Sequence, residues 1–341
     1  MTLPWNDFLA TRGAVIEADR IHFPSVSHEA AAHVVALKQL ALIRVVGSDA
    51  STFLHNLLSN DIRKLAPGGV EWSSLNTPKG RMLASLIVRA TDDGFDLFAS
   101  RDLAPDLQRR LGLYVLRSDV RITLPAESDI VLLGVCGADA ASTLTTAKLP
   151  APAPGTAVQD GALHCLALPT GAFIVTIPEA EAEAVWTRLV EAGAAEGGTD
   201  VWTLSMIRAG LPLITGATRE EFVAQMLNFE LIGGVNFHKG CYPGQEIIAR
   251  TQYLGKIKKR MYRVRIPAEH EPAAGEDVFT PRLGEQSAGK IVNVAPQADG
   301  THEALVVMQA ACAEAGEAHI GRPDGPRLTF LDLPYSLAGT A

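Results

Sequence analysis

The sequence predicts an α+β fold of several domains built on antiparallel sheets. Three observations support this class. Two strand patterns within residues 82–98 flank a tight turn and form a β-hairpin. Residues 129–198 follow a strand–helix–strand–strand–helix order that predicts a small ferredoxin-like sheet. From residue 256 onward, short alternating strands at regular spacing predict a small β-barrel. A chain of 341 residues is also too long for one compact core.

The first part of the chain alternates strands and helices. Residues 1–30 show no clear pattern, and the first clear strand ends at Gly47. Ser48 and Asp49 are good N-cap residues for the helix that follows, and Gly94 supplies the turn of the hairpin. The elements predicted here are strand Leu40–Val46, a helix through Phe53 and Leu58, hairpin strands Met82–Arg89 and Phe95–Phe98, helix Leu103–Leu113 and strand Val120–Leu124.

The rest of the chain divides at composition changes. The ferredoxin-like part contains strand Ile130–Val135, helix Ala138–Lys148, strands Leu163–Leu168 and Phe173–Ile177, and helix Glu179–Ala192. A further helix runs from Asp200 to Arg208 and stops at Gly210 and Pro212. We therefore expect a central domain of residues 1–128 plus 199–255, a ferredoxin-like domain of residues 129–198 and a C-terminal domain of residues 256–341.

Composition limits the function. The net charge of −8 argues against general binding to nucleic acids or anionic membranes. The cysteines, Cys136, Cys165, Cys241 and Cys312, have no paired spacing, so we expect neither disulfides nor a closed zinc site. No leader-like segment or apolar run of about 20 residues is seen, so we expect a cytoplasmic protein without a membrane partner.

The most informative stretch is Asn236–Arg250, which places Cys241 between two glycines and ahead of Pro243. Proline suits the first position of a helix, so Pro243 predicts a helix start. Cys241 would then lie where unpaired N–H groups and the helix dipole favour an anion. We expect its thiol to be more reactive than that of a core cysteine. A buried cysteine in a tight turn is the alternative.

Lys239–Glu246 resembles the K-G-C-Y-x-G-Q-E signature of the YgfZ family, folate-binding proteins related to the aminomethyltransferase of glycine cleavage. The resemblance extends to Asn76–Met82, Phe222–Asn228 and Leu333–Ser336. It implies an aminomethyltransferase-like fold and tetrahydrofolate, or a folate derivative, as cofactor. It also implies support of iron–sulfur cluster assembly or repair, with iron–sulfur client or assembly proteins as partners. An effect on tRNA modification would then be indirect, with no direct nucleic-acid contact.

The resemblance implies a set of site residues. Cys241, as a reactive thiol, and Lys239 would be catalytic. The residues expected to bind the folate are Trp202, Gln225, Asn228, Tyr242, Gln245, Glu246, Arg250, Lys79 and Arg81. Each group has a structural alternative: a core anchor for Trp202, loop bridging for the two amides at 225 and 228, a surface ion pair for Glu246 and Arg250, and solvated charge for Lys79 and Arg81.

Positions at which this chain differs from the family pattern help to choose among the possible functions. Leu40 stands where the family has a second tryptophan, a role that Trp5 or Trp72 could take. Ala84 and Ser85 stand where aminomethyltransferases carry two aspartates, which disfavours the alternative of a folate-dependent one-carbon transferase or demethylase and leaves enzymatic turnover open. His238 and Cys241 have the spacing of a metal-binding pair, but no second pair follows, so no metal site is expected. A scaffold with a vestigial folate pocket is the third candidate.

Overall fold

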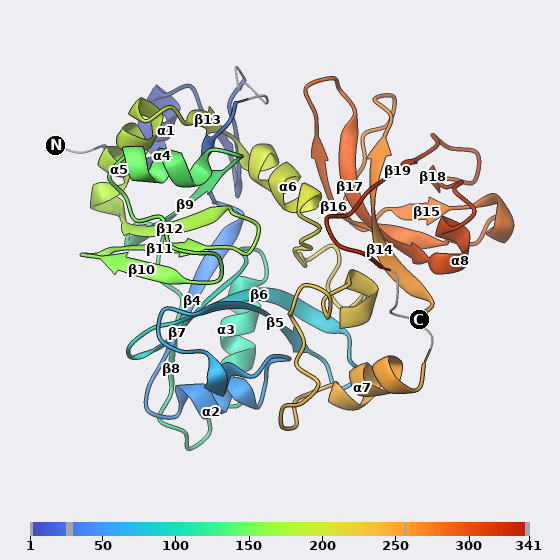
Figure 1. Ribbon diagram of the computed structural model, residues 1–341, viewed down its shortest axis with the longest axis horizontal. Coiled ribbons are helices and arrows are strands. Elements are labelled where there is room, and N and C mark those ends of the chain that lie inside the picture. Colours follow the sequence, from blue (N-terminus) through green and yellow to red (C-terminus); the bar gives the residue numbers. More distant parts are fainter. Residues whose placement is uncertain (1–2, 25–29, 256, 338–341) are drawn as a thin grey trace. The chain divides into compact units, whose positions relative to one another are not determined.

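The computed structural model describes residues 3–24, 30–255 and 257–337 (Figure 1). The chain forms two compact units. Unit 1 contains residues Met1–Phe53, Arg63–Glu71 and Ile87–Ser205, and unit 2 contains Leu54–Ile62, Trp72–Leu86 and Met206–Ala341. Both units are therefore discontinuous in sequence. The expected division into three domains stays a prediction.

The ferredoxin-like part of unit 1 is a six-stranded sheet with the order β10-β11-β12-β9-β3-β13. Its ladders are antiparallel except for the parallel pair of β13 and β3. The predicted strand and helix order is present, and β3 joins it from the N-terminal part. The bounds are β3 His33–Ala36, β9 Ile130–Cys136, α4 Ala140–Thr146, β10 Ala157–Asp160, β11 Leu163–Ala167, β12 Phe173–Pro178, α5 Glu179–Glu191 and β13 Ala195–Gly197.

The N-terminal residues form more structure than their sequence indicates. Helix α1 (Trp5–Thr11) is followed by the small hairpin of β1 (Val15–Glu17) and β2 (Arg20–His22). Trp5 lies in the core of unit 1, with its ring 5.7 Å from that of Trp186, and its backbone N–H donates to Glu179 at 2.7 Å. A seven-residue helix shows little periodicity and is stabilised by such tertiary packing.

The second sheet has the order β5-β6-β7-β4-β8. Strand β4 (Leu40–Val46) has the predicted bounds, and the predicted hairpin is formed by β6 (Met82–Ala90) and β7 (Gly94–Ser100). A Cβ atom on Gly94 would lie 2.2 Å from the carbonyl oxygen of Val45, so no side chain fits at this turn. The remaining elements are α2 Ala50–His55, η1 Ile62–Lys64, β5 Val70–Asn76, α3 Ala104–Gly112 and β8 Arg121–Thr123.

The C-terminal part of unit 2 is a curled six-stranded antiparallel sheet, a half-barrel with the order β18-β15-β16-β17-β14-β19 (Figure 1). The predicted alternation is confirmed in β14, where Val264 and Ile266 enter the core. The bounds are β14 Lys259–Ile266, β15 Asp277–Phe279, η3 Pro281–Leu283, β16 Gly289–Pro296, β17 His302–Gln309, α8 Ala310–Ala313, β18 His319–Ile320 and β19 Thr329–Leu331.

Three helical elements precede this sheet: α6 (Thr199–Arg208), η2 (Ala224–Leu227) and α7 (Gln245–Tyr253). Gly210, just beyond α6, has φ of +67°, and a Cβ there would meet the ring of Tyr335 at 2.6 Å. The predicted glycine stop of α6 is therefore confirmed and also makes room for the C-terminal segment. No helix in the described part of the chain is long and apolar enough to cross a membrane.

Candidate functional site around Cys241

Cys241 differs from the other cysteines in exposure. It lies on an exposed part of the loop before α7, whereas Cys136, Cys165 and Cys312 are buried, and all are free thiols. Burial raises the pKa of Cys136 and of Cys165 to about 12. A thiolate is the reactive form of cysteine, so Cys136 and Cys165 are protected both by burial and by protonation.

The loop enters α7 differently from the expectation. The helix begins at Gln245, with Gly244 as N-cap at φ +81°, so the prediction that Pro243 takes the first helical position is wrong. The left-handed residue separates Pro243 from the helical turn. Cys241 lies three residues before the N-cap, and a helix dipole acts mainly within its first turn. The start of α7 therefore gives little support to the predicted reactivity of the thiol, which stays a prediction.

A contact between two glycines fixes the start of α7. Gly80 and Gly244 lie against each other, because a Cβ on Gly244 would be 2.6 Å from Cα of Gly80 and 2.6 Å from the carbonyl oxygen of Thr77. A Cβ on Gly80 would lie 3.1 Å from Cβ of Ile247. The turn that carries Lys79 and Arg81 thus lies directly against the Cys241 loop. Both segments contain residues that the sequence predicts for the site.

We expect Gly244→Ala to destabilise unit 2 by about 2 kcal/mol, because alanine meets both a strained left-handed backbone and a backbone clash. Urea unfolding measures this change. Gly233→Ala is the matched control, since Gly233 also has positive φ, at +77°, but a Cβ there meets nothing within 4 Å. Equal losses in the two variants would show that the glycine contact contributes nothing.

Lys239 holds the Cys241 loop from inside. Its side chain is buried, and its ammonium group donates to the backbone carbonyls of His55, of Leu58 at 2.5 Å and of Asn60 at 2.9 Å. The same nitrogen lies 4.9 Å from the ring centre of Tyr242. Three charge-assisted hydrogen bonds make this lysine a strong positioning group. A catalytic role for Lys239 stays a prediction.

The entry of the loop is held by the same segment. The Oγ of Ser59 donates to the carbonyl of Gly234 at 2.6 Å. The amide of Asn60 donates to the carbonyls of Gly233 at 2.8 Å and Trp72 at 3.0 Å. Residues 233–242 therefore contact the 55–60 segment at their beginning and, through Lys239, near their end.

His55 and Asp61 form a buried pair that sequence reasoning missed. Nδ1 of His55 lies 2.8 Å from Oδ1 of Asp61, and both side chains are at most 6% exposed. On its other side the ring faces the loop, since a Cβ on Gly240 would lie 3.3 Å from Nε2 of His55. A histidine and an aspartate six residues apart form no recognisable sequence motif. Only the folded structure, in which His55 lies next to Gly240, brings them to attention.

Gln225 and Asn228 act as bridges inside unit 2. The amide of Gln225 donates to the carbonyl of Ile248 at 2.7 Å, and that of Asn228 donates to the carbonyl of Met261 at 2.8 Å. Both side chains are fully buried. These bonds tie the η2 segment to α7 and to β14. The buried Oε1 of Gln225 has no hydrogen-bond partner among the described residues.

The remaining residues predicted for unit 2 lie on or beside α7. Burial raises the pKa of Tyr242 to about 12, and the amide of Gln245 donates to the carbonyl of Lys239 at 3.4 Å. Glu246 and Arg250 are exposed, and no ion pair joins them in the described structure. On the neighbouring turn, Lys79 is exposed and Arg81 donates to the carbonyl of Glu221 at 2.5 Å.

The tryptophans and the Ala84–Ser85 pair are buried. Trp202, in unit 1, is 4% exposed and packs on Gly134, where a Cβ would lie 2.5 Å from its ring. Trp5 and Trp72 are also buried. Ala84 and Ser85 lie on β6, and the hydroxyl of Ser85 accepts from the backbone N–H of Ile214 at 2.9 Å. Ser85 thus has a structural partner within unit 2.

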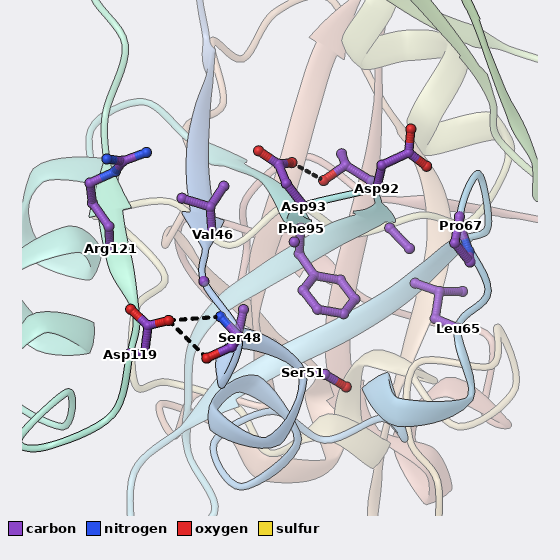
Figure 2. A pocket seen from close by; sticks show the side chains of 15 residues that line it. Val46, Ser48, Ser51, Leu65, Pro67, Asp92, Asp93, Phe95, Asp119 and Arg121 are labelled. Atoms are coloured by element: carbon purple, nitrogen blue, oxygen red, sulfur yellow. Dashed lines mark hydrogen bonds between the residues drawn. The ribbon is translucent and has the colours of Figure 1, made fainter.

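Unit 1 contains a separate pocket of about 740 Å³ (Figure 2). Figure 2 shows Asp119 accepting hydrogen bonds from the backbone N–H and the hydroxyl of Ser48 on one side. These bonds lower the pKa of Asp119. None of the catalytic or folate-binding residues predicted from the sequence lines this pocket. Among the residues that the structure describes, no group of three or more His, Cys, Asp or Glu side chains could hold a metal ion.

Comparisons with known proteins give relatives that match along most of the chain, while no family model matches. Proteins named tRNA-modifying protein YgfZ are 30% identical in Serratia proteamaculans, covering 94% of this chain and 99% of the relative, and 30% identical in Enterobacter sp., covering 89% and 93%. The crystal structure of glycine cleavage system aminomethyltransferase T from Bartonella henselae has a TM-score of 0.81 at 19% identity and covers 98% of both chains. This likeness confirms the predicted fold class.

Proposed function

The chain belongs to the family of the tRNA-modifying protein YgfZ, and from this premise we propose that it binds a folate and supports iron–sulfur cluster assembly or repair through Cys241. Its contribution to tRNA modification is then indirect, through iron–sulfur enzymes that modify tRNA. Its partners are a tetrahydrofolate and iron–sulfur client or assembly proteins.

The observation that carries the proposal is the exposed thiol of Cys241 on a loop held by buried polar contacts. A core cysteine needs no such support. A thiol that meets other molecules needs both access and a defined position, and a clamped loop supplies both. Such a thiol is suited to act as a nucleophile, a redox group or a transient iron ligand.

The side chains beside Cys241 suit the anionic end of a folate. Lys79 and Arg250 are exposed cations on the two segments that the Gly80–Gly244 contact joins, and Arg81 lies on the same turn. They would hold the carboxylates of the glutamate tail. Fewer groups are available to pair with the polar edge of the pterin, because the side-chain amides of Gln225 and Asn228 already donate hydrogen bonds to backbone carbonyls. A bound tetrahydrofolate would supply a reduced pterin ring.

Binding of tetrahydrofolate tests the cofactor proposal. We expect saturable quenching of tryptophan fluorescence, and about tenfold weaker binding by Trp202→Phe, because phenylalanine offers a smaller stacking face. Since the substitution also removes a fluorophore, the dissociation constants are measured by equilibrium dialysis as well. Trp186→Phe, which changes a fully buried tryptophan of unit 1, is the control. Unchanged affinity in Trp202→Phe would make Trp202 a core anchor only. No binding by the unsubstituted protein would remove the cofactor.

A further inference from the structure

We propose that the turn after α3, residues 113–117, is a docking surface for an acidic segment of another protein. The apolar part of this surface consists of Leu113, Tyr114 and Leu116, which form the apolar patch. All of it lies in unit 1. The inference goes beyond the proposed function, because it does not depend on the role of Cys241 or on a folate.

The apolar patch is exposed to an extent that the fold does not require. Leu113 is 67% exposed, Tyr114 is 47% exposed and Leu116 is 89% exposed. Nine large apolar side chains are exposed among the described residues, and these three lie within four consecutive positions. Single exposed leucines are common on protein surfaces, whereas a cluster of apolar side chains marks a contact with another molecule.

The backbone of Leu116 gives an independent reason. Its φ is +47°, a left-handed conformation that strains residues other than glycine. Its side chain lies almost entirely in solvent and so contributes little packing to unit 1. Neither the turn nor the core therefore requires a leucine at this position. Backbone strain of this kind is found where it serves a function.

The charges next to the apolar patch indicate the chemistry of the occupant. Arg109 and Arg110, in the last turn of α3, share one carboxylate, that of Asp106. Arg117 is exposed and forms no ion pair with any residue that the structure describes. Residues 106–117 thus contain three arginines and one aspartate, in a chain with a net charge of −8. A segment with carboxylates beside an apolar side chain complements this surface.

A hollow beside the apolar patch provides room for the occupant. It has a volume of about 650 Å³ and is lined by Asp49, Tyr114, Leu116, Arg117 and Ser118. The carboxylate of Asp49 already accepts the backbone N–H of Asp119 at 2.8 Å. Arg117 is therefore the charged group at the hollow that pairs with a carboxylate of the partner. Tyr114 and Leu116 contact its apolar side chain.

Two other occupants agree less well with the charges. A second copy of this chain that docked through the same surface would bring arginines against arginines. An anionic membrane would repel the net charge of −8 of the whole chain. An acidic protein segment agrees with both the apolar and the basic side chains of the turn.

The test uses a short fluorescein-labelled peptide with two leucines between glutamates, and fluorescence polarisation follows its binding to the full chain. We expect saturable binding that Leu116→Ser and Arg117→Gln each weaken about tenfold, because each removes one of the two complementary contacts. Leu254→Ser is the matched control, since Leu254 is 84% exposed and lies in unit 2. Equal affinity in Leu116→Ser, or for a peptide with lysines in place of the glutamates, would overturn the proposal.

Leu116→Gly separates docking from a role in the fold. Glycine accepts the left-handed backbone, so the urea midpoint should stay the same or rise while the affinity falls as in Leu116→Ser. A lower midpoint with unchanged affinity would show that the leucine serves the fold and would refute docking. No saturable binding of the glutamate peptide would refute it as well. Sedimentation with phosphatidylglycerol vesicles, or a dimer that Leu116→Ser dissociates, would then assign the surface to a membrane or to a second copy.

Discussion

Replacing Lys239 with methionine should destabilise unit 2 by about 3 kcal/mol, because three buried backbone carbonyls lose a charged donor while the volume of the side chain is kept. Urea unfolding at pH 7 measures the free energy of unfolding. Lys239→Arg should recover only part of the loss, since a planar guanidinium does not converge on three carbonyls as a compact ammonium does.

Lys79→Met is the matched control for this prediction. Lys79 is exposed on the turn next to the same loop, so its replacement should change the free energy of unfolding by less than about 0.5 kcal/mol. A loss below about 1 kcal/mol in Lys239→Met would mean that the three carbonyls find other donors, and that Lys239 does not hold the loop through its hydrogen bonds to the 55–60 segment.

Cys241→Ser should abolish function in cells and leave the free energy of unfolding within about 0.5 kcal/mol, because the side chain is exposed and serine is a poor nucleophile and iron ligand. The measurement is the activity of iron–sulfur enzymes in cells that depend on this protein. In the purified protein at pH 8, iodoacetamide should modify Cys241 and spare the three buried thiols.

Cys312→Ser is expected to have the opposite effects, a loss of stability without a loss of function. Cys312 is buried in the core of the half-barrel, so serine there should cost about 1–2 kcal/mol of stability, while function persists as long as the protein folds. If Cys241→Ser and Cys312→Ser support iron–sulfur enzymes equally well, the exposed thiol has no role in the function and the scaffold alternative gains.

Local patterns predicted the strands that read as apolar runs or as alternating segments. Strand β4 and the β6–β7 hairpin are apolar runs that are buried at almost every position, and β14 alternates between buried and more exposed residues toward its end. Helix α1 was missed because its seven residues depend on packing against α5 rather than on a repeat of their own. The start of α7 was misplaced because the left-handed conformation of Gly244 follows from its contact with Gly80, which no local pattern contains.

The same distinction applies to the site. The motif drew attention to Cys241 and Lys239, but the partners of Lys239 lie about 180 positions earlier in the chain, at separations of 184, 181 and 179 residues. His55 and Asp61 have no motif of their own and become visible only when the chain has folded. Gln225 and Asn228 had two interpretations, and the hydrogen bonds that they form support bridging.

Because the clamp on the Cys241 loop joins segments so far apart, the loop reaches its final form only after residues 54–62 have docked into unit 2. Closing a loop of this length is among the late and slow events of folding. A C-terminal fragment that lacks residues 54–62 thus carries the cysteine without these contacts. Alkylation of Cys241 at its native rate is therefore a chemical sign that residues 54–62 have docked against the loop.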